Sequence, residues 1–147
     1  MSDPLTFLGL AERAGKLIVG SDACGISVRA GKARVILLAS DASKNSEAKS
    51  KNYAEGSKAP VISLPYTKAE VGSVIGHGAP GMMVITDIGM ASGFISKLQE
   101  AFPEKYSDVS AELERRADKA AQRRKEAHRH EENIKHGKKK NKQSPHA

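Results

Sequence analysis

The stretch from Leu8 to Ser43 constrains the fold more than any other part of the chain. It is divided into segments of a few residues each by Gly15, Gly20 and Gly31. Because glycine ends helices well and tolerates backbone conformations that other residues avoid, each of these positions predicts a joint between two elements. The segments between the joints are predicted to form, in order, a helix, a short strand, a second helix and a buried strand.

The rest of the first hundred residues continues this alternation. Continuous apolar runs predict strands that are covered on both faces, at residues 34–39, 59–65 and 82–86, after a shorter strand at 16–19. Helices are predicted at residues 4–13, 23–29, 46–56 (capped by Asn45 or Ser46), 67–75 (with a Thr67–Glu70 capping box) and 89–102. Strands that alternate with helices of about ten residues predict an α/β fold with helices on both faces of the sheet.

The chain changes character after Pro103. Residues 103–147 contain thirteen Lys or Arg and eight Asp or Glu, so this segment carries +5 of the total charge of +7. Its residues have high helix propensity, but few of them are large and aliphatic. The sequence therefore predicts a domain at residues 1–102 and a basic extension at 103–147. In the extension, a lone and mostly exposed helix is expected to end near His136, followed by disorder at residues 137–147.

The charge and the cysteine content narrow the classes of function. A basic protein with a more basic tail favours an anionic partner, of which nucleic acid is the first choice and anionic lipid the second. Cys24 is the only cysteine, so no disulfide can form within the chain, and a reducing compartment fits. Neither a secretory signal nor an apolar run near the ~20 residues of a membrane span is evident. We expect a cytoplasmic protein without a membrane partner.

Residues that could carry chemistry are too scattered to predict a catalytic centre. Asp41 and Asp87 follow predicted strands, where α/β enzymes place active sites, but no histidine or second carboxylate completes a set. His128 and His130 are two residues apart, so they do not share a helix face as metal ligands would. Cys24, early in a helix, is either a thiol of lowered pKa or a small core residue. We expect no enzyme activity, no catalytic residue, no metal site and no cofactor.

The helix that begins after Gly20 is the first candidate for binding. A helix amino terminus presents unpaired N–H groups and a partial positive charge, and Gly20 has no side chain to obstruct an anion there. Ser21 and Asp22 are either caps of this helix or contacts to a ligand. Lys32 and Arg34, at the start of the next strand, are either solvated cations or part of the same binding surface.

A series of short motifs runs through residues 5–102, nearly the whole predicted domain. They are Leu8-Gly9-Leu10-Ala11, Arg13-Ala14-Gly15-Lys16-Leu17, Gly20, Arg29 with Gly31-Lys32-Ala33, Leu37-Leu38-Ala39 with Asp41-Ala42-Ser43, Pro60-Val61, Gly72 with Ile75-Gly76, and Val84-Ile85-Thr86-Asp87 with Gly89 and Ala91. Each motif is weak by itself, whereas their order is specific. In this order the chain resembles the bacterial YlxQ-type branch of the L7Ae/L30e ribosomal protein family.

The resemblance implies a three-layer α-β-α sandwich with a central mixed sheet of about four strands. It also implies binding to structured RNA, typically the kink-turn, a sharply bent internal loop with sheared G·A pairs. The partner would be ribosomal RNA, with ribosomal or RNA-processing proteins beside it and a role on the ribosome or in its assembly. The RNA-binding residues carried over by position are Gly20, Ser21, Asp22, Lys32, His77, Gly78, Ala79 and Pro80, and the charge pattern adds Arg34.

Three positions depart from the usual kink-turn reader. Such proteins carry Asn and then Glu where this chain has Asp22 and Ala23, and they often carry Lys where it has Ile26. A carboxylate at position 22 accepts hydrogen bonds from a guanine edge but repels phosphate. Two alternatives therefore stay open: a protein-interaction adaptor that kept the fold and lost kink-turn recognition, and a substrate-binding module of an RNA-modification system.

Overall fold

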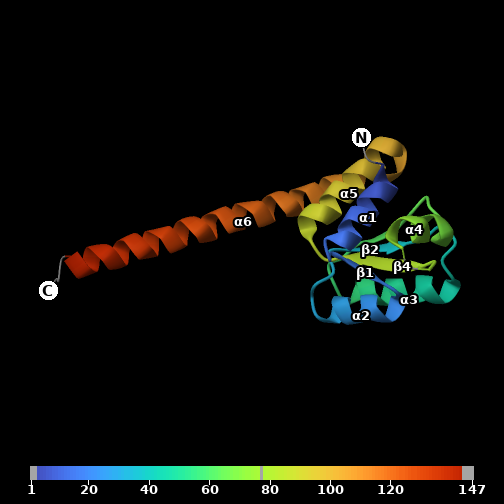
Figure 1. Ribbon diagram of the computed structural model, residues 1–147, viewed down its shortest axis with the longest axis horizontal. Helices are drawn as coiled ribbons and strands as arrows, with labels where there is room; N and C mark the ends of the chain where they lie inside the picture. The colour runs from blue at the N-terminus through green and yellow to red at the C-terminus, as the bar shows by residue number, and fades with distance from the viewer. Residues whose placement is uncertain (1–2, 77, 144–147) are drawn as a thin grey trace.

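Four short strands form one mixed sheet (Figure 1) within the residues that the computed structural model describes, 3–76 and 78–143. The strands are β1 (Leu17–Val19), β2 (Val35–Leu38), β3 (Val61–Ser63) and β4 (Met82–Ile85), and they lie in the order β1-β4-β2-β3. β2 and β3 are parallel, whereas β4 runs antiparallel to both of its neighbours, β1 and β2. The predicted mixed sheet of about four strands is confirmed.

The strand directions give the sheet two different ends. Because β1, β2 and β3 all run opposite to β4, their last residues meet at one end, together with the first residue of β4. We call this the carboxyl end of the sheet, and its register places Leu38 opposite Met82. At the other end, which we call the amino end, Ile85 lies opposite both Leu17 and Val35. Loops that are far apart in the sequence therefore lie together at each end.

Helices cover both faces of the sheet and complete a three-layer α-β-α sandwich (Figure 1). On one face lie α2 (Ser21–Arg29) and α3 (Lys44–Glu55), and on the other lie α1 (Pro4–Arg13), α4 (Lys68–Ile75) and α5 (Ile88–Ala101). Successive side chains of a strand point to opposite faces. In β2, Val35 and Leu37 accordingly join the larger core cluster under α1, α4 and α5, and Ile36 and Leu38 join the smaller cluster under α2 and α3. The double coverage that the apolar run predicted is confirmed.

Side-chain capping sets the start of α4 as the sequence predicts. The Thr67 hydroxyl accepts a hydrogen bond from the Glu70 N–H at 3.2 Å, and the Glu70 carboxylate accepts one from the Thr67 N–H at 3.0 Å. These two bonds are the reciprocal pair of a capping box. The start of α4 is therefore fixed by its own sequence.

Two other helices begin earlier than the sequence predicts. Ser43 caps α3, because its hydroxyl accepts from the Ser46 N–H at 3.1 Å, so the predicted cap at residue 45 or 46 is wrong. Gly20 is the N-cap of α2, so Ser21 and Asp22 are its first helical residues rather than its caps. In both cases the helix begins as soon as the turn after the preceding strand is complete, at Gly20 after β1 and at Ser43 after β2.

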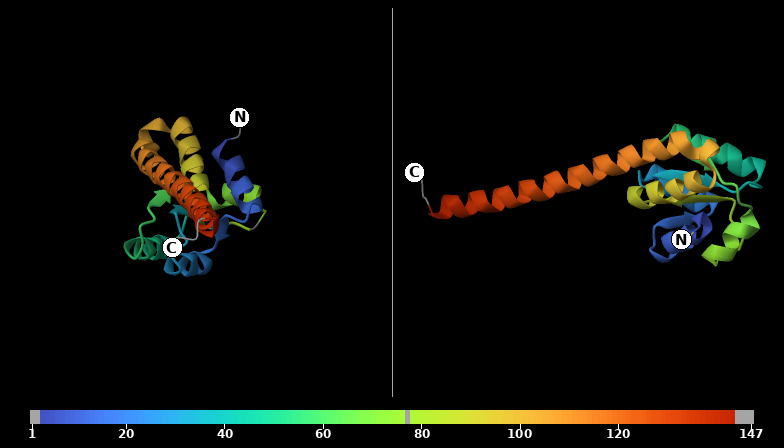
Figure 2. Two further views of the ribbon diagram at one scale, coloured as in Figure 1. Left: turned by 90° about the vertical axis from the view of Figure 1, so that its left-hand side faces the viewer. Right: turned by 90° about the horizontal axis from the view of Figure 1, so that it is seen from above.

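The basic extension is one long helix, α6 (Pro103–Gln143), about 60 Å in length. Its first turns pack on the domain: Tyr106 and Leu113 belong to the larger core cluster, and Val109 lies against it. The Tyr106 hydroxyl donates a hydrogen bond to the Ser63 carbonyl oxygen at 2.7 Å. The rest of α6 leaves the domain (Figure 2), and residues 121–129 are all exposed.

The sequence-based description of this extension needs two corrections. A lone, exposed helix is wrong for its first turns, because Tyr106, Val109 and Leu113 follow helical spacing and form one apolar stripe. Disorder from residue 137 is also wrong as far as Gln143, since α6 continues to that residue, and extending a helix costs far less than starting one. Residues 144–147 lie outside the described part of the chain. The division into two parts at residue 102 stays a prediction.

Leu113→Ala is expected to lower the free energy of unfolding by about 2–5 kcal/mol, because it empties a fully buried site in the core. Leu10→Ala is the matched control: Leu10 is also helical but 43% exposed, and its truncation should cost less than about 1 kcal/mol. Urea unfolding followed by circular dichroism measures both. An equal loss of unfolding free energy in the two variants would show that Leu113, and with it the first part of α6, does not pack in the core.

Candidate nucleic-acid interface

Three helices begin at the carboxyl end of the sheet. α2, α3 and α4 follow β1, β2 and β3, and the loop residues 78–81 lead into β4 at the same end. The first turn of a helix carries N–H groups without intrahelical acceptors and a partial positive charge. This end of the sheet therefore gathers three helix starts and one loop where a ligand can reach them.

The protein's own side chains close two of these helix starts. Ser43 caps α3, and the capping box closes α4. In addition, the Asp41 carboxylate accepts a hydrogen bond from the Lys68 N–H at 2.7 Å. α2 differs, because no side chain in the described part of the chain caps its first turn. The first N–H groups of α2 are therefore the ones that remain available to an anion or to a base edge.

Gly20 connects the open start of α2 to Met82, the residue directly after the loop at 78–81. Its N–H donates to the Met82 carbonyl oxygen at 3.0 Å and so extends the pairing of β1 with β4 by one residue. Its φ of 99° is a conformation that glycine adopts readily and other residues rarely do. The Ala39 N–H donates to the Gly81 carbonyl oxygen at 3.0 Å, so the same loop is also tied to β2.

The loop is seated directly on α4. A Cβ atom at Gly72 would collide with the carbonyl oxygen of Gly78 and would lie 2.9 Å from its carbonyl carbon. A glycine is therefore required at position 72 for the loop to keep this position. Gly78 and Ala79 are exposed and Pro80 is half-buried, so this part of the loop is accessible at the carboxyl end of the sheet.

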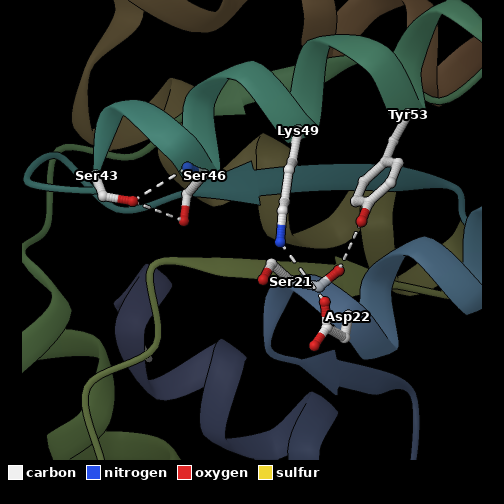
Figure 3. Close-up of polar contacts among 6 residues, drawn as sticks. All are labelled: Ser21, Asp22, Ser43, Ser46, Lys49 and Tyr53. Atoms are coloured by element: carbon white, nitrogen blue, oxygen red, sulfur yellow. Dashed lines mark hydrogen bonds and ion pairs between the residues drawn. The ribbon is translucent and has the colours of Figure 1, made fainter.

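α3 supports the first turn of α2 from one side (Figure 3). The Tyr53 hydroxyl donates a hydrogen bond to the Ser21 carbonyl oxygen at 3.1 Å. Gly25 makes room for this ring, because a Cβ atom there would lie 2.5 Å from the Tyr53 hydroxyl oxygen. The glycine that weakens α2 as a helix thus allows α3 to fix its start.

Asp22 stands at the open end of α2. Its carboxylate lies 3.6 Å from the Lys49 ammonium nitrogen (Figure 3), and the Asp22 side chain is 94% exposed. Because solvent screens such a pair, it contributes little to the stability of the fold. The carboxylate is therefore free to exchange Lys49 for a ligand.

The structure brings together only part of the predicted surface. Gly20 is hydrogen-bonded to Met82, which directly follows the loop segment that carries Gly78, Ala79 and Pro80. Both predicted segments therefore lie at the carboxyl end of the sheet. His77 lies outside the described residues. Lys32 and Arg34 are exposed at the amino end of the sheet, where the Arg34 N–H donates to the Ile85 carbonyl oxygen at 2.9 Å. The nine residues of α2, about 13 Å in length, separate these two cations from Gly20.

Three lysines that the sequence analysis passed over lie near the carboxyl end. Lys44 and Lys68 are the first residues of α3 and α4, and Lys49 pairs with Asp22. Lys68 could have been found because it directly follows the predicted cap Thr67, whereas Lys44 follows Ser43, which the sequence analysis did not recognise as a cap, and Lys49 carried no signal. Four acidic residues share this end of the molecule, namely Asp22, Asp41, Glu47 and Glu70. The surface is consequently not strongly basic.

Cys24 is a core residue rather than a reactive thiol. Its side chain is fully buried in the smaller core cluster, and its Sγ–H donates to the Ile18 carbonyl oxygen at 3.7 Å. Burial raises the pKa of the thiol to about 12, because the thiolate would lose its hydration. Of the two interpretations of Cys24, the small core residue is confirmed.

The two aspartates that follow predicted strands have structural roles. Asp41 accepts from the Lys68 N–H, and Asp87 caps α5 by accepting from the Met90 N–H at 2.9 Å. Among the residues whose side chains the structure describes, none of which lies beyond residue 129, no cluster of His, Cys, Asp or Glu is arranged to hold a metal ion. None of the helices described there combines the length and apolar character that crossing a membrane requires.

The fold and this site define a three-layer α-β-α protein whose candidate binding surface consists of an open helix start and a neighbouring loop. The sequence profile of the ribosomal protein L7Ae/L30e/S12e/Gadd45 family matches residues 6–92. The chain belongs to this family, as the ordered motifs predicted.

Two similar proteins support the assignment to the YlxQ-type branch of the family. RNA-binding protein YlxQ of Enterococcus faecium is 36% identical over 96 residues, which are 65% of this chain and 87% of that protein. RNA-binding protein YlxQ of Bacillus subtilis is 36% identical over 95 residues, which are 62% of this chain and 90% of that protein. Each match leaves more than a third of this chain without a counterpart.

Solved structures share the fold at low sequence identity. A protein of unknown function from Bacillus halodurans has a TM-score of 0.61 at 23% identity, over 67% of this chain and 99% of that one. A 15.5 kD RNA-binding protein of Giardia lamblia has a TM-score of 0.53 at 14% identity, over 65% and 82%. They confirm the three-layer architecture.

The Cys24 thiol is expected not to react with Ellman's reagent in the native protein at about pH 8, because only the thiolate is nucleophilic and its pKa is raised to about 12. One equivalent should react at once when guanidinium unfolds the chain. Rapid reaction of the native protein would show that the start of α2 opens to solvent.

Gly72→Ala is expected to destabilise the protein by about 1–3 kcal/mol, because the added methyl group overlaps the Gly78 backbone and forces the loop away from α4. Gly56→Ala is the control: the nearest atom to its added Cβ lies 3.8 Å away, so stability should change by less than about 1 kcal/mol. Thermal unfolding compares the two variants. A Gly72→Ala protein as stable as Gly56→Ala would show that the loop is not seated on α4.

Proposed function

We propose that this protein binds structured RNA at the carboxyl end of its sheet, without catalysing a reaction. The observation that carries this proposal is the uncapped start of α2 beside the exposed loop at Gly78 and Ala79, in a chain whose relatives are named RNA-binding proteins. Irregular or unpaired RNA suits such a surface, because its base edges and backbone are accessible outside the deep A-form groove.

Each part of the proposed surface makes a chemically different contact with the RNA. The open N–H groups of α2 donate to phosphate oxygens or to base acceptors, and Gly20 leaves room for the backbone of the RNA. Asp22 accepts hydrogen bonds from a base edge that offers donors, such as guanine. The loop at residues 78–80 packs against an unstacked base or sugar. Lys44, Lys49 and Lys68 supply the salt-dependent contacts to phosphate.

We further propose that the RNA is of the kink-turn type, within ribosomal RNA, and that the protein acts on the ribosome or in its assembly. Membership of the family supports this finer assignment. The way in which this protein would recognise the RNA depends on Asp22, Ala23 and Ile26, because they replace the Asn, Glu and Lys of the usual kink-turn reader. All three lie on the exposed side of α2. We expect recognition to depend on shape more than on charge at this surface.

An adaptor function is the second candidate, and the exposure of Ile26 favours it. This side chain is 62% exposed on the surface of α2, where a protein partner could cover it. Binding of the full chain to kink-turn RNA, a plain duplex and ribosomal RNA fragments separates the two candidates. Tight and selective binding of the kink-turn supports the first, and no binding to any of the three supports the adaptor.

Asp22→Asn is expected to tighten binding to kink-turn RNA roughly threefold, because it removes a negative charge beside phosphate and releases Lys49. Fluorescence anisotropy with a labelled kink-turn RNA measures the change. Stability should hardly alter, since the Asp22 side chain is almost fully exposed.

Glu100→Gln is the matched control for this charge change. Glu100 is exposed on α5, which lies on the opposite face of the sheet from α2, so its neutralisation should leave RNA affinity within about twofold. If both variants bind the kink-turn RNA as tightly as the wild type does, the RNA does not approach the start of α2 as proposed.

A further inference from the structure

A groove lies at the amino end of the sheet, on the far side of the domain from the surface proposed above. It encloses about 560 Å³ between α6 and the residues that precede β2 and β3. Ala33, Ala59 and Ile88 contribute its small and apolar lining. Arg34, which the charge pattern assigned to the RNA surface, lines this groove instead.

The groove carries a strong positive charge. Its lining contains six cations and one acid, and the cations are Arg34, Lys58, Arg115, Arg116, Lys119 and Arg123. We call this set the basic groove. Glu112, its acid, pairs with Arg115 and Arg116. Among the side chains that the structure describes, which reach residue 129, no carboxylate forms an ion pair with the other four cations.

One face of α6 supplies most of these cations. Residues 112, 115, 116, 119, 120 and 123 all line the groove, and their spacing of three and four places them on one side of the helix. The stripe extends about 16 Å along the axis. The Arg116 guanidinium also donates to the Lys58 carbonyl oxygen at 2.8 Å, which fixes α6 against the start of β3. The stripe is thus held in place against the domain.

Cations gathered in this way repel one another unless an anion neutralises them. Guanidinium groups bind phosphate through paired hydrogen bonds, and lysines bind it as point charges. The lining includes no aromatic side chain on which a base could stack, which favours contact with a backbone over contact with bases. The ligand that fits this chemistry is a phosphodiester chain.

We propose that the basic groove binds the phosphodiester backbone of RNA, independently of sequence, as a second RNA contact surface. The inference rests on the proposed function in one respect: the groove supplies the charge that the carboxyl end lacks. There, three lysines stand among four acidic residues. The carboxyl end of the sheet would recognise the shape of the RNA, and the basic groove at the amino end would neutralise the charge of its phosphate backbone.

The test compares two double variants of the full chain that lose the same charge. Lys119→Gln with Arg123→Gln removes two groove cations that make no ion pair in the described part of the chain. Arg124→Gln with Lys125→Gln removes two exposed cations from other faces of the same helix, and neither lines the groove. The probe is a labelled plain RNA duplex, and anisotropy is recorded at several salt concentrations.

The groove variant is expected to bind the duplex roughly five- to tenfold more weakly, with a slope of log affinity against log salt that is shallower by about 1.5. The control variant should stay within about twofold. Equal losses in the two variants would assign the effect to overall charge and overturn the proposal, as would no loss in either. Tighter binding of polyglutamate than of RNA to the wild-type groove would overturn it in favour of an acidic protein partner.

The same experiment separates this inference from the proposed function. If the groove variant binds kink-turn RNA as the wild type does, while Asp22→Asn still changes that affinity, the groove proposal alone fails. If the wild-type protein binds no RNA, both fail.

Protection of an introduced thiol from a maleimide tests directly whether the RNA occupies the basic groove. Because Cys24 is buried, Lys119→Cys introduces a single accessible thiol in the described part of the chain, whose reaction with a maleimide should slow severalfold when duplex RNA is bound. Lys125→Cys should react at the same rate with and without RNA. Equal protection of both thiols, or protection of neither, would overturn the groove as the site of contact.

Discussion

The antiparallel position of β4 between β1 and β2 is the constraint on which the rest of this structure depends. β1 and β2 both run antiparallel to β4, and β3 runs parallel to β2, so the helices that follow these three strands all begin at the carboxyl end of the sheet. The direction of β4 also returns the loop before it to that end and sends α5 from the other. A parallel β4 would separate the loop from α2 by the length of the sheet. The location of the candidate binding surface therefore follows from the order and direction of four strands.

The two ends of the sheet differ in chemistry because different elements meet there. Helix starts and glycines dominate the carboxyl end, where nearby acids offset the lysines. Arginines and lysines of α6 dominate the amino end, where they face the starts of β2 and β3. The family fold supplies the first end, and residues beyond the family match supply much of the second. A protein of this class can thus gain a second surface without altering its first.

The sequence predicts local structure well here and spatial grouping poorly. Apolar runs, glycine joints and the Thr67 capping box depend on neighbours in the chain, so the elements and layers were predictable. The separation of Lys32 and Arg34 from Gly20 depends on which end of the sheet each residue reaches, and no local pattern encodes strand direction. Tyr106 and Leu113 were missed in the core because an apolar stripe of three residues is lost within a strongly charged segment.

The contact between Tyr53 and Gly25 links the candidate binding surface to α3, which has the fewest buried residues among the helices α1 to α5. α3 is strongly polar, and Ser50 is its one fully buried residue. Such a helix opens locally at a lower free energy than its neighbours. Each opening releases the Ser21 carbonyl group and loosens the first turn of α2. A ligand that requires an ordered α2 therefore binds only the molecules in which α3 is folded. Its apparent affinity depends on the stability of α3 as well as on its own contacts.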